Sequence, residues 1–336
     1  MTQTPDLAVA MDWGGTWTRV AVVDRAGDIR WQNRVANTTD AGKEQMLAVA
    51  EGLLLEAVEW AGRSRVAGVG IAVAGPVDPV DGTLYQPPNL LVLDGVSLKP
   101  LWEATLGLPV KVGNDANLAA LGEYHHGAGR SAREQGASVR TLVYLTVSTG
   151  IGGGVVDGGR MLLGANGLAA EIGHMTIDFT DGAPRCLCGG SGHLESLASG
   201  TAIARIARER LANEAPSGSL LAEQPAESLT SESVFQAAGQ NDPLATSILD
   251  GVVRVLSVGL TNVLHLYNPD LVVLGGGVSG GLRDLGLLDR IHAQILERAM
   301  SQRHTEFQLV VSELGDAVGM VGAATLVWSE SGTDSR

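Results

Sequence analysis

The chain has 336 residues, of which 45% are hydrophobic, and this is enough apolar material for two ordinary domain cores. Its formal net charge of -14 at pH 7 argues against nucleic acid as a partner, because binding a phosphate backbone requires clustered Lys and Arg. We expect a globular protein of the cytoplasm without a membrane partner, since no stretch of about eighteen apolar residues occurs and the first residues do not resemble a signal peptide.

The first two predicted strands flank a glycine turn. Residues 7–11 and 18–24 are apolar runs that predict buried strands, so the chain opens with a hairpin. Glycines in the turn let backbone N–H groups approach a ligand closely, and Asp12 at the strand end can hold a hydrated Mg²⁺. The alternative is an ordinary hairpin turn. The turn consists of Asp12, Trp13, Gly14, Gly15 and Thr16, which adds a hydroxyl group.

A helix and a third strand come next and complete an α/β unit. Residues 43–62 carry apolar side chains at helical spacing, and residues 66–74 predict a buried strand. Gly75 turns the chain at the end of this strand, where open α/β sheets bind ligands. Asn89 follows two prolines in a loop, and it either offers its amide to a ligand or simply forms a turn.

Two polar residues stand between a short strand and a helix. Residues 110–112 predict the strand and residues 118–124 the helix, so Asn114 and Asp115 lie at their junction. Asp115 is either the helix cap or an acid that accepts a hydroxyl proton and orients the attacking oxygen.

The layout of the opening hairpin recurs after a polar segment at residues 130–140, which we expect to be a mobile connection. Residues 142–147 predict a strand, residues 148–154 a glycine-rich turn that contains Thr149 and Gly150, and residues 155–157 another strand. A matched pair of such hairpins predicts two related α/β halves, each presenting a phosphate-binding turn to a shared cleft.

The only two cysteines of the chain lie one residue apart. Cys186 and Cys188 together with His174 and His193 provide four donors, the number that a closed tetrahedral zinc site needs. A disulfide between the two cysteines is sterically poor at this separation. The alternative is a reduced, buried cysteine pair beside unrelated histidines.

Carboxylates bracket this loop on both sides. Glu171 precedes His174 by three residues, and Glu195 follows His193 by two. Such side chains on one wall are suitable acceptors for sugar hydroxyls, whereas a solvated helix residue is the alternative for Glu171.

The C-terminal third is mainly helical. Residues 213–232 are rich in Ser, Pro, Glu and Ala, and they predict an exposed, flexible excursion. Three glycines at residues 275–277 follow a strand end, where flat backbone permits contact with an adenine or ribose. The remaining predictions are helices at 199–212, 244–267, 283–300 and 319–328, a strand at 269–274, and a frayed tail at 329–336.

Together these segments resemble the ROK family of sugar kinases and sugar-responsive repressors, and within it most closely the bacterial ATP-dependent glucokinases. The resemblance implies the actin-like ATPase (ribonuclease H-like) fold, with two α/β domains around a central cleft. It also implies a smaller domain at residues 1–116, completed by a helix at 317–330, and a larger domain at 117–316 that holds the zinc loop. The motifs that carry the resemblance are Asp12 to Thr16, Pro88 to Leu90, Gly113 to Asn117 with Ala119 to Glu123, Ser148 to Gly154, Glu171 to His174, Cys186 to Gly192 and Gly275 to Gly277.

The resemblance also implies roles for single residues. Asp115 would be the catalytic base. The residues implied to hold the sugar are Asn89, Asn114, Asp115, Glu171, His174 and Glu195. Those implied to face the phosphates and the rest of the nucleotide are Asp12, Gly14, Gly15, Thr16, Thr149, Gly150, Gly275, Gly276 and Gly277. The implied ligands of a structural Zn²⁺ are His174, Cys186, Cys188 and His193.

The chain departs from the family pattern at two places. The family usually has a third Cys where this sequence has His193, although Cys₂His₂ is also a known zinc set. The segment after Asn89 lacks the usual Pro-Gly-Trp, and residues 91–94 read Leu-Val-Leu-Asp instead. This second departure bears on which hexose is preferred.

We therefore expect transfer of the ATP γ-phosphoryl group to the 6-hydroxyl of a hexose, with glucose as the first choice and ATP, Mg²⁺ and structural Zn²⁺ as cofactors. The alternatives are a ROK kinase for N-acetylmannosamine, mannose or fructose, a non-kinase actin-like ATPase, and a sugar-responsive repressor. The repressor would need an N-terminal helix-turn-helix before the Asp12 hairpin. Polyphosphate is an alternative donor, and the expected assembly is a homodimer or a tetramer.

Overall fold

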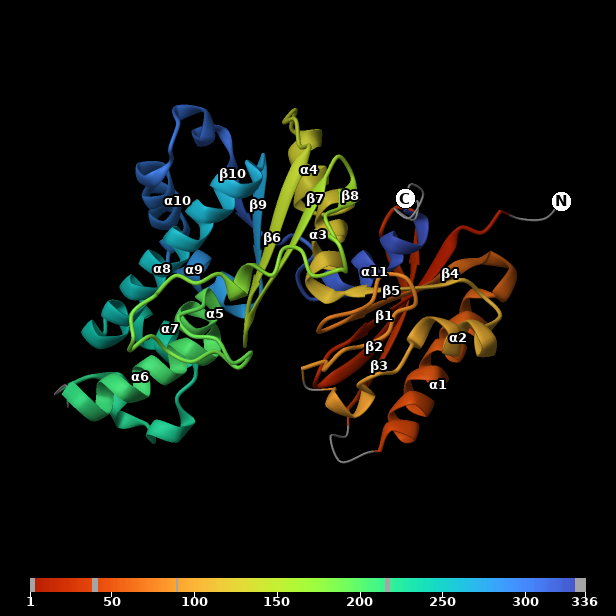
Figure 1. Ribbon diagram of the computed structural model, residues 1–336, viewed down its shortest axis with the longest axis horizontal. Helices are drawn as coiled ribbons and strands as arrows, with labels where there is room; N and C mark the ends of the chain where they lie inside the picture. The colour runs from red at the N-terminus through yellow and green to blue at the C-terminus, as the bar shows by residue number, and fades with distance from the viewer. Residues whose placement is uncertain (1–3, 38–41, 89, 215–217, 330–336) are drawn as a thin grey trace. The chain divides into compact units, whose positions relative to one another are not determined.

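The structure is a computed structural model that describes residues 4–37, 42–88, 90–214 and 218–329. These residues fold into two compact units, each with strands and helices of its own (Figure 1). Unit 1 consists of Met1–Ser138, Gly154–Ala170 and Glu313–Arg336, and unit 2 of Val139–Gly153 and Glu171–Ser312. The chain therefore crosses between the units after residues 138, 153, 170 and 312.

The sheet of unit 1 has the strand order β3-β2-β1-β4-β5. The first three strands are antiparallel, and β4 and β5 run parallel to β1. Strand β1 is apolar on both faces because it lies in the middle of the sheet between two layers of helices. The strands are β1 (Leu7–Trp13), β2 (Trp17–Asp24), β3 (Ile29–Ala36), β4 (Val66–Val73) and β5 (Val110–Asn114).

Helices cover both faces of this sheet. Helices α1 (Lys43–Ala61) and α2 (Leu98–Leu106) share a core with Met11 and the other alternate residues of β1. On the opposite face, helix α11 (Val318–Trp328) packs directly on the backbone of β4, since a Cβ at Gly70 would lie 1.8 Å from the carbonyl oxygen of Ala323. Unit 1 also contains α3 (Asp115–His125), α4 (Ala128–Glu134) and β8 (Arg160–Met161).

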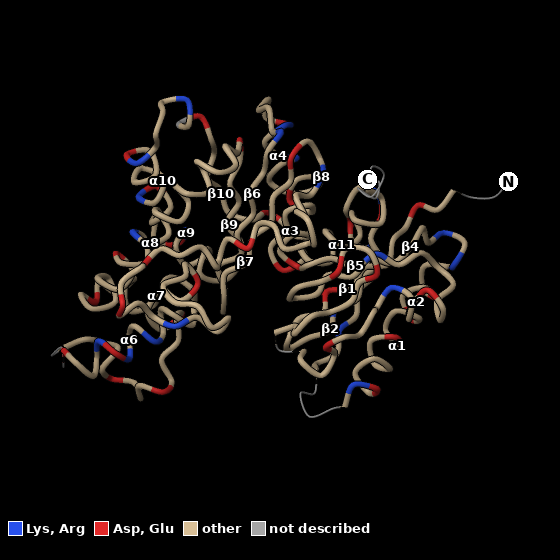
Figure 2. The backbone as a smooth tube through the Cα atoms, in the orientation of Figure 1, with Lys and Arg blue, Asp and Glu red and all other residues tan. Residues whose placement is uncertain are grey.

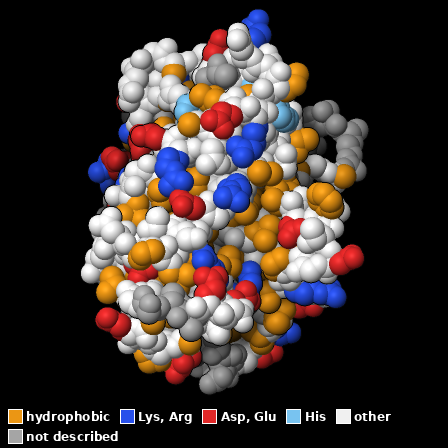
Figure 3. All heavy atoms as spheres, turned by 90° about the vertical axis from the view of Figure 1, so that its left-hand side faces the viewer, with side chains coloured by type: hydrophobic (Ala, Val, Ile, Leu, Met, Phe, Trp, Pro, Cys, Tyr) orange, Lys and Arg blue, Asp and Glu red, His pale blue; other side chains and the backbone are white. Residues whose placement is uncertain are grey.

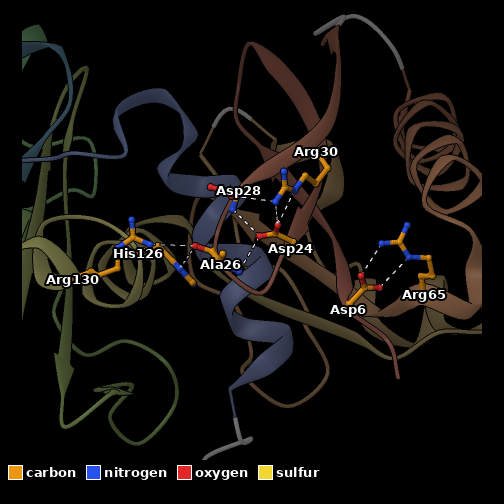
Figure 4. Close-up of polar contacts among 8 residues, drawn as sticks. All are labelled: Asp6, Asp24, Ala26, Asp28, Arg30, Arg65, His126 and Arg130. Atoms are coloured by element: carbon orange, nitrogen blue, oxygen red, sulfur yellow. Dashed lines mark hydrogen bonds and ion pairs between the residues drawn. The ribbon is translucent and has the colours of Figure 1, made fainter. Parts of the chain in front are cut away.

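Helix α3 is fixed at its C-terminal end to the turn between β2 and β3 (Figure 4). The Nδ1 atom of His126 lies 3.0 Å from the carbonyl oxygen of Ala26, and a guanidinium N–H of Arg130 donates to the same oxygen at 3.4 Å. Asp24 shapes the turn by accepting the amide of Ala26 at 2.9 Å and pairing with Arg30. These contacts hold the helix that begins at Asp115 against the hairpin that contains Asp12.

The second sheet has the strand order β10-β9-β6-β7-β8. Numbered along the chain within each sheet, both sheets therefore have the order 3-2-1-4-5, which confirms the prediction of two related halves. Strand β7 begins in unit 2 and ends in unit 1. The remaining strands are β6 (Thr141–Val147), β7 (Ile151–Asp157), β9 (Leu271–Gly275) and β10 (Gln308–Val311).

Unit 2 is built around one long helix, α8 (Pro243–Tyr267). Asp242 caps its N-terminus by accepting the amide of Ala245, and Asn268 in a left-handed conformation ends it. In the part of the chain that the structure describes, α8 is the one helix long and apolar enough to cross a membrane, and 61% of its most apolar window is buried, as a core helix requires. The other helices of unit 2 are α5 (Leu194–Ala198), α6 (Gly200–Glu214), α7 (Ser231–Gly239), α9 (Gly277–Asp284) and α10 (Leu287–Arg298).

The surface carries charges of both signs. Figure 2 shows Lys and Arg scattered among Asp and Glu over both units, without a continuous basic track. Figure 3, which views the molecule from the left-hand side of Figure 1, shows hydrophobic side chains in small groups between polar ones.

Two predictions about secondary structure are wrong, and a third holds in part. The segment 130–140 is not a mobile connection in its first half, because residues 130–134 belong to α4, which buries Ala132. The described part of 213–232 is mostly exposed, as predicted, but its Leu221 and Leu229 are fully buried and anchor it. The single helix predicted at 283–300 is divided, since Gly286 in a left-handed conformation separates α9 from α10.

The predicted domains at residues 1–116 and 117–316 stay predictions. Residue 116 lies within unit 1, where α3 packs against α11. The predicted C-terminal helix at 317–330 corresponds to α11 and belongs to unit 1.

Candidate active site

The glycine turn of unit 1 leaves backbone donors unused. The amide of Gly14 donates to the carbonyl oxygen of Trp17 at 3.1 Å, which closes the turn between β1 and β2. Among the described residues, the amides of Gly15 and Thr16 donate to no acceptor. Successive free N–H groups at a turn form a concave site for an anion such as a phosphate.

Two carboxylates lie beside this turn at the ends of neighbouring elements. Asp12 stands near the end of β1, and Asp115 is the first residue of α3. Burial, and after it the negative charge of Asp115, raises the pKa of Asp12 to about 6, although Arg19 lowers it. Burial also raises the pKa of Asp115, against the effect of the Ala116 amide that donates to it at 2.8 Å. The two carboxylates are thus close enough to interact and are poorly solvated.

The N-terminal turn of α11 lies close to Asp12. A Cβ at Gly319 would lie 2.8 Å from Cγ of Asp12, so only glycine allows this approach. Arg19 faces Asp12 across the β1–β2 ladder, and its guanidinium donates to the carbonyl oxygen of Asp316 at 3.3 Å. Sequence analysis did not single out Arg19 or Gly319, although the antiparallel hairpin register could have identified Arg19 as the neighbour of Asp12.

Asn114, rather than Asp115, caps helix α3. Its Oδ1 accepts the amides of Ala116 at 3.0 Å and Asn117 at 3.1 Å, and its Nδ2 donates to the carbonyl oxygen of Gly75 at 3.3 Å. The side-chain cap of α3 is thus Asn114, whereas the carboxylate of Asp115 accepts the amide of Ala116 through Oδ1 at 2.8 Å. Asn89 lies outside the described residues.

In unit 2 the second glycine turn, residues 148–154, packs against Glu195. The Oε2 atom of Glu195 accepts the amide of Ile151 at 2.9 Å, and a Cβ at Gly150 would lie 2.4 Å from that oxygen. The carbonyl oxygen of Thr149 accepts the amide and the hydroxyl of Thr201, the latter at 2.8 Å. Residues of α5 and α6 thus hold the turn in place.

The four predicted metal ligands converge in unit 2. One donor atom from each of His174, Cys186, Cys188 and His193 lies within 4.8 Å of the others. The Sγ atom of Cys186 lies 3.8 Å from Nδ1 of His174, and that of Cys188 lies 3.3 Å from Nδ1 of His193. Tetrahedral Zn²⁺ with its usual bond lengths separates a sulfur and a nitrogen ligand by about 3.6 Å. The donor set and its spacing therefore fit zinc.

The loop geometry and the thiol chemistry agree with this fit. The amide of Cys186 donates to the carbonyl oxygen of Gly190 at 2.9 Å, and the amide of Gly189 donates to that of Cys186 at 3.0 Å, so the loop turns back on itself. Burial raises the pKa of Cys186 to about 11, with a further contribution from the charge of Glu195. The thiol is therefore protonated at neutral pH unless a cation displaces its proton.

The bracketing carboxylates contact the same cluster. Glu195 links it to the glycine turn, because its Oε1 lies 3.5 Å from Sγ of Cys186 while its Oε2 binds Ile151. Glu171 lies on the other side, with Oε2 3.9 Å from Nε2 of His174, and its side chain is exposed. His174 can thus bind a metal through Nδ1 while Nε2 faces Glu171.

The third glycine turn lies against the second one. A Cβ at Gly276 would lie 2.4 Å from the carbonyl oxygen of Val147 and 3.1 Å from Cβ of Ser148. Within unit 2 the structure therefore brings together residues 148–150 and 275–277. Glu195 packs against residues 148–150.

Comparisons with known proteins agree with this arrangement. A model of the ROK family matches residues 8–330. The chain is 34% identical over 322 residues to a glucokinase of Halalkalibacterium halodurans, covering 95% of this chain and 94% of the relative. It is 31% identical to a putative xylose repressor of a Caldicellulosiruptor species, covering 96% of this chain and 78% of the relative. The crystal structure of a ROK family glucokinase from Streptomyces griseus in complex with glucose and AMPPNP is similar, with a TM-score of 0.76 and 32% identity over 95% of this chain and 98% of that one.

Proposed function

The chain belongs to the ROK family, and on this premise we propose that it transfers the γ-phosphoryl group of ATP to the 6-hydroxyl of glucose. The predicted membership is thereby confirmed, and so is the predicted fold, since the two five-stranded α/β sheets are those of the actin-like ATPase fold of ROK sugar kinases. A cytoplasmic location and a homodimer stay predictions.

The observation that carries the proposal is the pair of poorly solvated carboxylates beside a turn with free amides in unit 1. A phosphoryl transfer site needs donors for phosphate oxygens, an acid group for the metal and a group that orients the attacking hydroxyl. Gly15 and Thr16 supply the amides, Asp12 the metal carboxylate and Asp115 the base. Mg²⁺ bound near Asp12 would neutralise charge on the transferred phosphate.

Asp115 is proposed to accept the proton of the sugar hydroxyl. An exposed Asp has a pKa of about 3.9 and is a weak base at neutral pH. Burial raises the pKa of Asp115, which brings it closer to the range in which a carboxylate accepts a proton efficiently. Because phosphoryl transfer is loose and the proton leaves late, the orientation of the hydroxyl matters more than the basicity.

The residues of unit 2 are proposed to hold the sugar and the rest of the nucleotide. The proposed sugar contacts are the carboxylates of Glu171 and Glu195, the imidazole of His174 and the amides of Asn89 and Asn114. Zn²⁺ bound by the Cys and His cluster would fix His174 and the segment of Glu195 without taking part in the reaction. Thr149, Gly150 and residues 275–277 are proposed nucleotide contacts.

Asp115 variants test the proposal most directly. We expect Asp115→Asn to lower kcat more than tenfold in a coupled assay with Mg-ATP and glucose, because the amide keeps the hydrogen bond to Ala116 but cannot accept a proton. Asp115→Ala should lose at least as much. Asp28→Asn is the matched control, since its carboxylate is 65% exposed in the turn between β2 and β3. A loss below tenfold for both Asp115 variants would contradict the role.

Initial rates over a panel of hexoses decide the acceptor. We expect glucose to give the highest kcat/KM, with N-acetylmannosamine, mannose and fructose as the alternatives, and ATP to exceed GTP and polyphosphate as donor. A second candidate function is sugar sensing without transfer, which the similarity to a repressor favours. Binding of glucose without any turnover of ATP would support that candidate instead.

A further inference from the structure

Asn37 follows the end of β3, the edge strand of the first sheet, and contacts the glycine turn of unit 1. Its Oδ1 accepts the hydroxyl of Thr18 at 2.6 Å, and its Nδ2 donates to the carbonyl oxygen of Gly14 at 2.6 Å. Its backbone amide donates to the carbonyl oxygen of Thr16 at 2.8 Å. Three hydrogen bonds from one residue therefore span the turn from its first glycine to the start of β2.

These bonds engage carbonyl oxygens of the turn but none of its amides. Asn37 engages the carbonyl oxygens of Gly14 and Thr16, which would repel a phosphate if they faced it. The amides of Gly15 and Thr16 have no acceptor among the described residues, so the donors stay available for an anion. The hydroxyl of Thr18 is buried, with 2% of the residue exposed, so its bond to Asn37 lies on the protein side of the turn.

We propose that Asn37 is a positioning residue for the phosphoryl donor: it holds the turn of Gly14 to Thr16 in the conformation whose free amides bind the phosphates of the nucleotide. The inference rests on the proposed kinase function. Asn37 acts through the turn and does not touch the phosphates itself.

Only a carboxamide of this length satisfies both partners at once. One atom must accept from a hydroxyl while the other donates to a carbonyl. An aspartate keeps the acceptor for Thr18, but it cannot donate to Gly14 and adds a negative charge close to the phosphate site. An alanine loses both side-chain bonds and leaves the carbonyl of Gly14 free to turn toward the ligand.

The variants are tested by calorimetric binding of the non-hydrolysable ATP analogue AMPPNP with Mg²⁺ and by KM values for both substrates. We expect Asn37→Ala to raise Kd for the analogue and KM for ATP about tenfold, which corresponds to about 1.4 kcal/mol, while KM for the sugar stays unchanged. Asn37→Asp should weaken nucleotide binding more than Asn37→Ala. The matched control is Asn33→Ala on the same strand, where Nδ2 of Asn33 binds the exposed Glu56 at 2.9 Å.

Thr18 provides an independent route to the same bond. Thr18→Val removes the hydroxyl and should raise Kd about threefold, whereas Thr18→Ser keeps the hydroxyl and should restore binding. The double variant of Asn37→Ala and Thr18→Val should bind no more weakly than Asn37→Ala alone, because both changes break one interaction. If Asn37→Ala does not fold, Thr18→Val and Thr18→Ser still test the proposal.

Three results would overturn the inference. The first is an unchanged Kd in Asn37→Ala and Thr18→Val while the wild type binds AMPPNP. The second is an equal rise in KM for ATP and sugar, which would indicate general damage to the fold. A wild type that binds no Mg-nucleotide would refute the kinase function as well, and this outcome distinguishes the two failures.

Discussion

Asp12 shows at the scale of one residue how a functional group can oppose stability. Burial raises its pKa to about 6, above the ordinary value of 3.8, so folding favours the protonated carboxyl. The stabilising contribution of that proton is complete below about pH 4 and is lost as the pH rises through 6. At neutral pH the ionised carboxylate, which a metal requires, is therefore destabilising in the protein without ligands.

Asp12→Asn should consequently stabilise the protein at high pH and weaken its activity. The amide resembles the protonated acid, so we expect the free energy of unfolding to rise on the order of 1 to 3 kcal/mol above pH 7 and to change little near pH 4. Thermal unfolding between pH 4 and 8 in the absence of Mg²⁺ measures this, with Asp28→Asn as the exposed control. The same shift of Tm at both ends of the pH range would contradict the argument.

Sequence reasoning identified single residues where their spacing alone indicates chemistry. The four metal ligands are such a case, because a Cys-x-Cys step with two histidines has few other uses, and the structure brings them together. Asn37 could not be identified in this way. An asparagine after a strand is typical of any turn, and its role depends on Gly14 and Thr18, which only the folded hairpin brings near it.

At the scale of elements, a buried carboxylate joins three segments of unit 1. Glu123 of α3 is fully buried and accepts the amide of Ala128, the first residue of α4, at 2.8 Å. It also accepts the amides of Leu314 at 3.0 Å and Glu313 at 3.4 Å, where the chain re-enters unit 1. Helix α3 carries Asp115 at its other end, so Glu123 helps to fix the helix that orients the proposed base.

Loss of Glu123 should destabilise unit 1 strongly. We expect Glu123→Ala to lower the free energy of unfolding by about 3 kcal/mol, because one buried and two partly buried amides lose their acceptor, and Glu123→Gln to cost roughly half as much, since one acceptor oxygen remains. Denaturant titration followed by tryptophan fluorescence measures both. Glu134→Ala in α4, 68% exposed and 3.6 Å from Arg130, is the control and should change stability by less than about 0.5 kcal/mol. Equal effects at the two glutamates would refute this account.

Elements were predictable where burial imposes a pattern. The apolar runs of β1, β4 and β6 and the long helix α8 are evident in the sequence, because each buries most of its side chains. Strand β3 was missed because it is an edge strand whose polar side chains are mostly exposed. Helix α4 was missed because its arginines and glycines resemble a loop, whereas its contact with Glu123 exists only in the folded chain.

At the scale of the whole molecule, the spectroscopic probes and the metal cluster lie in different units. The zinc ligands belong to unit 2, between residues 174 and 193. All six tryptophans belong to unit 1, at positions 13, 17, 31, 60, 102 and 328. Tryptophan fluorescence therefore reports on unit 1 alone, while circular dichroism reports on the helices of both units.

This separation allows a test of both the metal and the coupling of the units. We expect about one Zn²⁺ per chain in protein purified without chelator and negligible Zn²⁺ in His193→Ala. Chelation of the wild type should lower Tm, because a bound metal stabilises the folded state. We expect the fluorescence transition to fall together with the dichroism transition, since β7 runs from one unit into the other and cannot unfold in only one of them.

The His193→Ala variant is the control for this experiment. Without a complete ligand set it should already unfold at the lower temperature, and a chelator should shift neither transition further. If the chelator shifts dichroism in the wild type but leaves the fluorescence transition in place, the units unfold independently, and the strand they share does not couple them. If wild type and variant contain equally little zinc, the four side chains form no metal site, and Glu195 must be held by its bond to Ile151 alone.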